Sequence, residues 1–136
     1  MTMALQYGEF LVQHFRQPRN YGTLPDPDVA YEDVNPLCGD RIRMELRVDA
    51  SQTITAVRFR GDGCIISRAA ASILTELIQG DTLQHVVRLP TERLLTALGT
   101  EIRPARRKCA LLPLHVVQAG IVAAYALPNP PPFPIC

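Results

Sequence analysis

The sequence is poor in aromatic residues and carries no strong net charge. It has no tryptophan, 6% aromatic residues, and a formal net charge of +1. A nearly neutral chain gives no overall electrostatic reason to bind nucleic acid or an anionic membrane. We therefore expect neither as a partner.

Long apolar runs and targeting signals are also missing. No run approaches the roughly 18 apolar residues of a membrane span, and residues 1–10 lack the basic and apolar regions of a signal peptide. These absences predict a cytoplasmic protein. In that reducing compartment, cysteines serve more often as ligands or nucleophiles than as disulfide partners.

The four cysteines form no CxxC pair, and three of them lie far apart along the chain: Cys38, Cys64 and Cys109. This spacing excludes a compact zinc-finger knuckle. If the three sulfurs meet, the whole fold must bring them together, as is usual for open functional sites rather than structural staples.

The hydrophobic content of 47% over 136 residues is enough for one domain with its own core. We assign this domain to residues 1–126. Residues 127–136 are rich in proline and end in Cys136, so we expect an extended or disordered tail.

The first half of the domain has the alternation of a sheet. Apolar and charged residues alternate cleanly over Arg41–Val48, which predicts a half-buried strand. A turn leads from it into a second strand over Thr53–Arg60, and Val29–Val34 is a plausible third. The sheet is therefore predicted to be antiparallel.

Helical spacing dominates the rest of the chain. A stripe of apolar residues begins at Cys64 and ends before Gly80, so the second cysteine is expected to open a helix. Pro113 should kink the last helix or start a fresh one beside Cys109, since it lacks the N–H that would bond the Cys109 carbonyl. The expected helices are Leu5–Phe15, the segment from Cys64 to Gly80, Thr82–Val87, Thr91–Leu98 and Pro104–Tyr125.

Each of the three cysteines has a local setting that favours a thiolate. Gly39 allows a tight turn that places Cys38 and Asp40 on one side of a loop. Cys64 follows Gly63 at a strand-to-helix corner, where backbone N–H groups and the helix dipole lower a thiol pKa. Cys109 follows a basic run that favours the charged sulfur in the same way.

Three thiolates and one carboxylate suit tetrahedral Zn²⁺, and they equally suit an exposed iron–sulfur cluster with one exchangeable ligand. Taken singly, any of these cysteines is more often a small buried hydrophobic residue, and only their combined settings favour a site. Cys136 on the tail is predicted to be a bystander. The three histidines, His14, His85 and His115, lie at no ligand spacing and are predicted to be structural or solvent-facing.

At these residues the chain resembles the U-type iron–sulfur assembly proteins, the IscU, SufU and NifU N-terminal family. The matching motifs are His14 to Asn20, Asn35 to Arg43, Gly61 to Gly80 and Pro104 to Ala110. The resemblance implies an α+β fold, with helices packed on one side of a three-stranded antiparallel sheet. It also implies a site made by Cys38, Asp40, Cys64 and Cys109.

The resemblance leaves two functions open, and a third interpretation, a structural zinc domain without chemistry, ranks below both because aspartate is an uncommon ligand in closed structural sites. The first is a scaffold that takes sulfur from a cysteine desulfurase, builds a labile cluster, expected to be [2Fe–2S], and passes it to apo-proteins or a downstream scaffold. The second is a zinc-dependent sulfurtransferase in which Cys38 accepts the persulfide. We favour the scaffold over an enzyme. Lys108, in place of the histidine of the IscU branch, is SufU-like, whereas the missing insertion between Cys64 and Cys109 is IscU-like.

Overall fold

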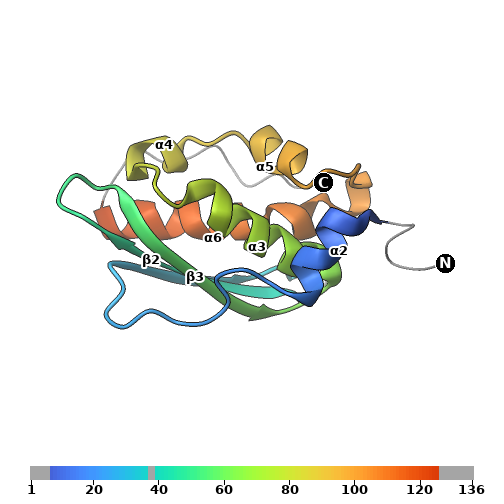
Figure 1. Ribbon diagram of the computed structural model, residues 1–136, viewed down its shortest axis with the longest axis horizontal. Coiled ribbons are helices and arrows are strands. Elements are labelled where there is room, and N and C mark those ends of the chain that lie inside the picture. The colour runs from blue at the N-terminus through green and yellow to red at the C-terminus, as the bar shows by residue number, and fades with distance from the viewer. Residues whose placement is uncertain (1–6, 37–38, 126–136) are drawn as a thin grey trace.

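The computed structural model describes residues 7–36 and 39–125. It forms a three-stranded antiparallel sheet in the order β1-β2-β3, with helices on one side (Figure 1). The predicted α+β architecture is confirmed. The predicted tail, residues 127–136, lies outside the described residues.

In chain order the elements are α2 (Glu9–Arg16), β1 (Val29–Val34), β2 (Arg41–Val48), β3 (Ile54–Asp62), α3 (Ile65–Ile78), α4 (Leu83–Val87), α5 (Thr91–Ala97), the 3₁₀ helix η1 (Pro104–Arg106) and α6 (Arg107–Tyr125).

The alternation of β2 translates directly into two faces of the sheet. Ile42, Met44 and Leu46 are buried under the helices, and the charged residues between them point to the other face. In the register, Met44 lies opposite Phe59 of β3. β3 begins at Ile54 rather than Thr53, because Thr53 pairs instead with Thr82 ahead of α4. It also runs on to Asp62, two residues beyond the prediction.

The outer edge of β3 is covered by a short stretch of chain that follows α2. Tyr21 forms an isolated parallel bridge with Phe59, and the Gly22 N–H donates to the Phe59 carbonyl at 2.9 Å. The Phe59 N–H in turn donates to the Asn20 carbonyl at 3.0 Å. This stretch therefore satisfies backbone groups that an edge strand would otherwise expose.

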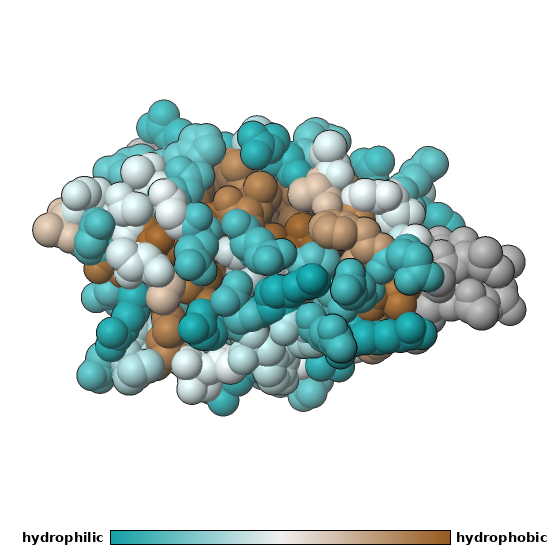
Figure 2. All heavy atoms as spheres, in the orientation of Figure 1, coloured by the Kyte–Doolittle hydropathy of each residue, from teal (hydrophilic) through white to brown (hydrophobic). Residues whose placement is uncertain are grey.

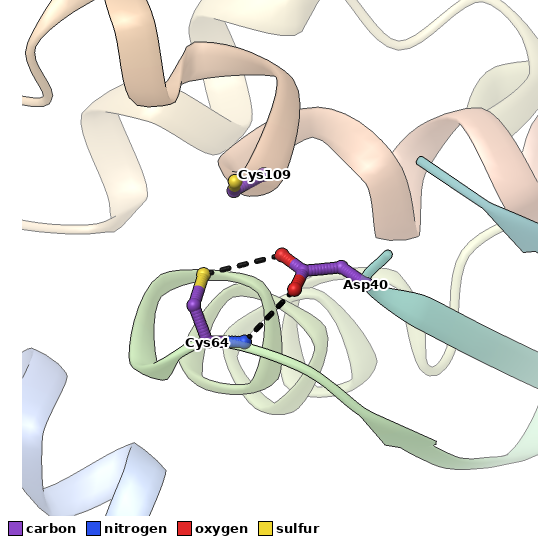
Figure 3. Close-up of side chains that lie close together, drawn as sticks. All are labelled: Asp40, Cys64 and Cys109. Carbon is purple, nitrogen blue, oxygen red and sulfur yellow. Dashed lines mark hydrogen bonds between the residues drawn. The ribbon is translucent and has the colours of Figure 1, made fainter. Parts of the chain in front are cut away.

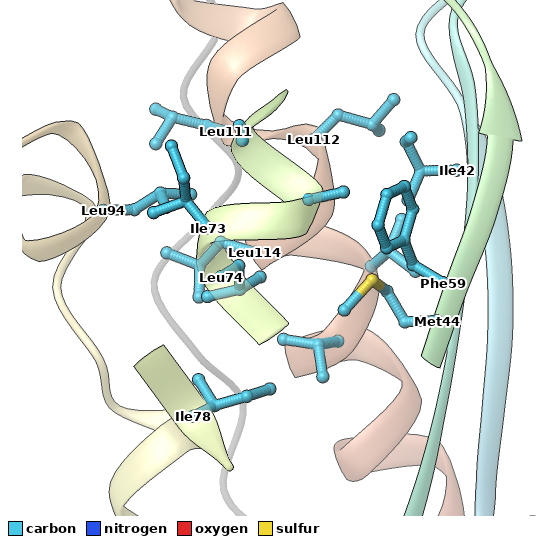
Figure 4. Packing of buried hydrophobic residues seen from close by; sticks show 14 of the residues in the cluster. Ile42, Met44, Phe59, Ile73, Leu74, Ile78, Leu94, Leu111, Leu112 and Leu114 are labelled. Atoms are coloured by element: carbon cyan, nitrogen blue, oxygen red, sulfur yellow. The ribbon is translucent and has the colours of Figure 1, made fainter. Parts of the chain in front are cut away.

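Two long helices, α3 and α6, pack side by side on the sheet, and α4 and α5 lie outside them (Figure 1). The core fills the space between these layers, with side chains from all of them meeting (Figure 4). Gly120 lets α6 approach β1, since a Cβ at this position would lie 2.9 Å from the Cβ of Tyr31. On the face seen in Figure 2, hydrophobic residues appear mostly as recessed patches between hydrophilic ones.

The ends of α2 and α3 follow local rules. Within the described residues, α2 begins at Glu9, later than the predicted Leu5, with Gly8 at its N-cap in a positive-φ conformation. Cys64 is the N-cap of α3, as predicted, and Gly80 follows its end with φ of 89°. Glycine adopts this left-handed conformation without steric cost, which explains where α3 stops.

Of the two alternatives predicted for Pro113, a kink or a fresh helix start, the fresh start is wrong. α6 is assigned as one continuous helix from Arg107 to Tyr125, with Pro113 buried inside it. Packing explains this tolerance, because the neighbouring residues of α6 are buried against α3 and the sheet. Tertiary burial on this scale outweighs the roughly 3 kcal/mol that an internal proline costs an isolated helix.

The C-terminal helical segment is more apolar than the sequence analysis predicted. The segment Pro104–Tyr125 is long and apolar enough to meet the length and composition test for a membrane span, so the absence of such a segment was wrongly predicted. However, 61% of its apolar window is buried inside the domain. We interpret it as the central core helix, whose apolar surface is used against α3, β1 and β2.

Candidate metal or cluster site

A tight loop delivers Asp40 to the start of β2. The Asn35 N–H donates to the Asp40 carbonyl at 2.8 Å, and the Gly39 N–H donates back to the Asn35 carbonyl at 2.7 Å. Gly39 has φ of 77°, a conformation that favours glycine. Asp40 is 4% exposed, so the loop holds its carboxylate inside the protein surface rather than in open solvent.

The N-terminus of α3 delivers Cys64 to the same place. The Cys64 N–H donates to Asp40 Oδ1 at 3.1 Å, and Cys64 Sγ lies 3.2 Å from Asp40 Oδ2 (Figure 3). Gly63 makes this approach possible. A Cβ on Gly63 would lie 2.7 Å from Ser67 Oγ and 2.9 Å from Asp40 Oδ1, so any larger residue would push the carboxylate or the helix away.

Cys109 comes from the first turns of α6 and is 4% exposed. One sulfur each from Cys64 and Cys109 and one carboxylate oxygen from Asp40 all lie within 4.8 Å of one another. Three segments that are distant in sequence therefore converge on one point (Figure 3). This is the only such group of potential ligands among the described residues.

Hydrogen bonding within the site lowers the pKa of Cys64 to about 6. The largest cause is a hydrogen bond with Cys109, which stabilises the Cys64 thiolate. Burial opposes the shift, the Ser67 backbone supports it, and the Asp40 carboxylate opposes it again. The balance of these effects brings the pKa of Cys64 below neutral pH, which favours its thiolate there despite an anionic neighbour.

A cation stands beside this thiolate. The Arg106 guanidinium is hydrogen-bonded to Cys64, which raises the pKa of Arg106 further above its ordinary value. The basic run was predicted to favour the charged form of Cys109, and Arg106 interacts first with Cys64 and more weakly with Cys109. The basic run is visible in the sequence, but which cysteine Arg106 contacts depends on the way η1 turns into α6.

The donor set fits the groups that sequence analysis suggested. Zinc bonds of about 2.0 to 2.3 Å in tetrahedral geometry place donor atoms about 3.5 to 3.8 Å apart, so a small inward adjustment of the three residues would hold an ion. Two sulfurs with one oxygen also suit iron. The predicted fourth ligand, Cys38, lies outside the described residues, as does Cys136.

The three histidines contact other groups. His14 Nδ1 is 2.7 Å from Ser72 Oγ in the interior, His85 contacts Asp81 at the surface, and His115 Nε2 is 3.2 Å from Asp33 Oδ2. None belongs to the group of potential ligands formed by the described residues.

Comparison with known proteins supports the assignment of the fold and the family. The family model "NifU-like N terminal domain" matches residues 6–128. The chain is 32% identical over 120 residues to the iron–sulfur cluster assembly scaffold protein IscU of Aquifex aeolicus, covering 88% of this chain and 76% of the relative. It is 31% identical over 132 residues to the zinc-dependent sulfurtransferase SufU of Bacillus subtilis, covering 85% and 88%.

A solved structure gives the same picture of the fold. The crystal structure of a putative iron–sulfur cluster assembly scaffold protein for the SUF system from Fervidobacterium islandicum aligns with a TM-score of 0.72. The alignment covers 88% of this chain and 99% of that one at 23% identity. The match of the family model over nearly the whole domain, together with these relatives, shows that the chain belongs to the NifU-like N-terminal domain family, which includes IscU and SufU.

Proposed function

We propose that this protein is an iron–sulfur cluster assembly scaffold. It accepts sulfur from a cysteine desulfurase, combines it with iron on Cys38, Asp40, Cys64 and Cys109, and passes the labile cluster to apo-proteins. The observation that carries the proposal is the convergence of three donor atoms within 4.8 Å from three separate segments. IscU, a relative that matches over most of its length, is named as such a scaffold.

The four residues would have different roles toward the cluster, which is the cargo of the reaction. Soft thiolate ligands suit iron–sulfur clusters and hold them firmly, whereas the Asp40 carboxylate is a harder and weaker ligand for them. An oxygen ligand would therefore favour release. Arg106 would balance the negative charge that accumulates when several anionic ligands meet, since it already lies beside the Cys64 sulfur.

The site also suits exchange with a partner. Cys64 is half-buried, while Asp40 and Cys109 are buried behind it. Neither of these two cysteines is in a disulfide, which suits the reducing cytoplasmic compartment that we propose for this protein. An incoming sulfur donor would meet Cys64 before the deeper ligands.

A zinc-dependent sulfurtransferase is the second candidate, favoured by the low pKa of Cys64 and by the similarity to SufU. In that mechanism Asp40, Cys64 and Cys109 would hold Zn²⁺, which keeps thiolates deprotonated. The Cys38 thiolate would attack the outer sulfur of the desulfurase persulfide. The S–S bond of the donor breaks, its cysteine leaves as a thiolate, and the new persulfide sits on Cys38 with no net oxidation.

The test of the scaffold is anaerobic assembly with a cysteine desulfurase, cysteine and ferrous iron. We expect a visible cluster that moves to an apo-ferredoxin within minutes. Cys64→Ser should abolish its formation, whereas the matched Cys136→Ser should not. Repeated failure of the unmodified chain to form a cluster would reject the scaffold function.

A second measurement separates the two candidates. Without iron or dithiothreitol, the zinc-loaded protein is incubated with the desulfurase and cysteine, and its intact mass is measured. Strong stimulation of desulfurase turnover, with one added sulfur and retained zinc, would favour the sulfurtransferase. Weak stimulation together with iron-dependent cluster formation would favour the scaffold.

A further inference from the structure

Three basic residues surround the start of α6, next to the site. Arg103 precedes η1, and Arg107 and Lys108 open α6 directly before Cys109. Arg103 and Arg107 are exposed and Lys108 is half-buried. We call these three residues the basic collar. Arg106, in the same run, is the one that turns inward to Cys64.

The basic collar is unfavourable for the helix that carries it. The N-terminus of a helix bears a partial positive charge, so cations in its first turn are destabilising. Neither η1 nor α6 has an acidic residue in its first turn to offset them. α2 shows the opposite, favourable pattern, with Glu9 in its first turn and Arg16 in its last.

The basic collar also has no acidic partner within the described part of the chain. The ion pairs among these residues involve other side chains. Arg107 shares a shallow pocket with Glu92 and Glu101, but forms no ion pair with either of them. A cluster of like charges that opposes its own helix and remains unpaired indicates a role outside the fold.

We propose that the basic collar docks an acidic surface of the cysteine desulfurase that supplies sulfur; this inference rests on the proposed function. A sulfur donor must bring its cysteine to the site, and the collar lies beside Cys109 and within one helical turn of Arg106. Three compact charges on a chain with net charge +1 match a local acidic patch on a protein better than the long, uniform charge of a nucleic acid.

The test compares two double charge reversals. Arg103→Glu with Arg107→Glu alters the basic collar. Arg88→Glu with Arg93→Glu is the control, with Arg88 at the C-cap of α4 and Arg93 in α5. All four arginines are exposed, and both variants change the net charge equally. Association with the purified desulfurase is followed by stopped-flow fluorescence between 20 and 500 mM salt, alongside thermal unfolding of each variant.

We expect the association rate of the collar variant to fall about tenfold at low salt and to approach that of the unmodified chain, within about twofold, at high salt. The control should stay within about twofold throughout. Because glutamate is favourable at a helix N-terminus, the melting temperature of the collar variant should not fall. Slower association combined with unchanged or greater stability would be hard to explain by damage to the fold.

Equal association rates for the unmodified chain and the collar variant would overturn the proposal, provided the unmodified chain becomes sulfurated. Failure of the unmodified chain to receive sulfur would overturn the proposed function as well. A third result would replace the inference. If a single-stranded DNA oligonucleotide bound through the collar while desulfurase association ignored it, the collar would be a nucleic-acid contact.

Discussion

α3 contributes to two polar clusters that differ in chemistry and in exposure. In the middle of the helix, Ser72 Oγ contacts His14 Nδ1 at 2.7 Å and accepts from the Arg19 N–H at 2.8 Å. Thr75 Oγ1 accepts from the Asn20 amide at 3.0 Å. His14, Ser72 and Thr75 are almost fully buried, and each of the three side chains has a hydrogen-bond partner.

At the N-terminus of the same helix lies the second cluster, made by two cysteines and an aspartate. Cys64 Sγ lies 3.2 Å from Asp40 Oδ2, and a hydrogen bond with Cys109 is the largest cause that lowers the pKa of Cys64 to about 6. This cluster is also partly open, because Cys64 is half-buried. Buried, hydrogen-bonded hydroxyl and imidazole groups fasten segments together, whereas two sulfurs and a carboxylate gathered within 4.8 Å near the surface are suited to binding a cation.

The largest effect is expected at the open cluster, formed by Asp40, Cys64 and Cys109. Cys64→Ser replaces a soft ligand and should lower zinc affinity by more than the roughly 10–100-fold that loss of an outer-shell contact costs. Chelator competition measures the change. Thermal stability of the metal-free protein should change little, and a large drop would assign Cys64 to the fold instead.

The reciprocal change is Ser72→Ala in the closed cluster, formed by His14, Ser72 and Thr75. It leaves His14 Nδ1 and the Arg19 N–H without their partner in the interior, and each unsatisfied group costs about 1–3 kcal/mol. Urea denaturation should show this loss, while zinc affinity stays the same. Ser51→Ala in an exposed turn is the control and should stay within about 0.5 kcal/mol. A tenfold loss of zinc affinity in Ser72→Ala would break the distinction between the clusters.

Gly63→Ala tests whether the open cluster depends on close backbone packing. The added methyl would press on Ser67 Oγ and the Asp40 carboxylate, so we expect zinc affinity to fall about tenfold, the lower end for a disturbed ligand. Gly80→Ala is the matched control, because its φ of 89° should cost stability without touching the metal. Equal zinc affinities in the two variants would contradict the packing argument.

The smallest expected effect concerns pH. Burial, followed by the charge of Arg19, lowers the pKa of His14 below 6.5, and Glu76 only partly compensates. Below about pH 6.5 the unfolded chain therefore binds more protons than the folded one, so stability is fully present above this pH and falls as the pH drops. Urea denaturation between pH 5.5 and 7.5 should show this slope. His14→Gln should reduce it, and an unchanged slope would assign the effect to other groups.

The sequence was most informative where a short pattern decides the structure alone. The alternation of β2 predicted its buried face, and the glycine-flanked corner predicted that Cys64 opens α3. Both depend on neighbours within a few residues. The convergence of Asp40, Cys64 and Cys109 could be suggested from their settings, but only the packing of α3 and α6 on the sheet produces it.

Other features could not be predicted because distant contacts determine them. Pro113 continues α6 because its neighbours are buried, and Thr53 leaves the hairpin because it meets Thr82. The direction of Arg106 depends on the 3₁₀ turn before α6. In each case a local preference gives way to tertiary contacts.

The short stretch around Tyr21 also affects how the molecule behaves among its own copies. An uncovered edge strand is a template on which a second chain can add a strand, and long apolar edges are a common starting point for aggregation. By bonding to Phe59 on both its N–H and its carbonyl, this stretch closes that route along the middle of β3. A protein proposed to open its cysteine site to partners thus protects a sheet edge from unwanted ones.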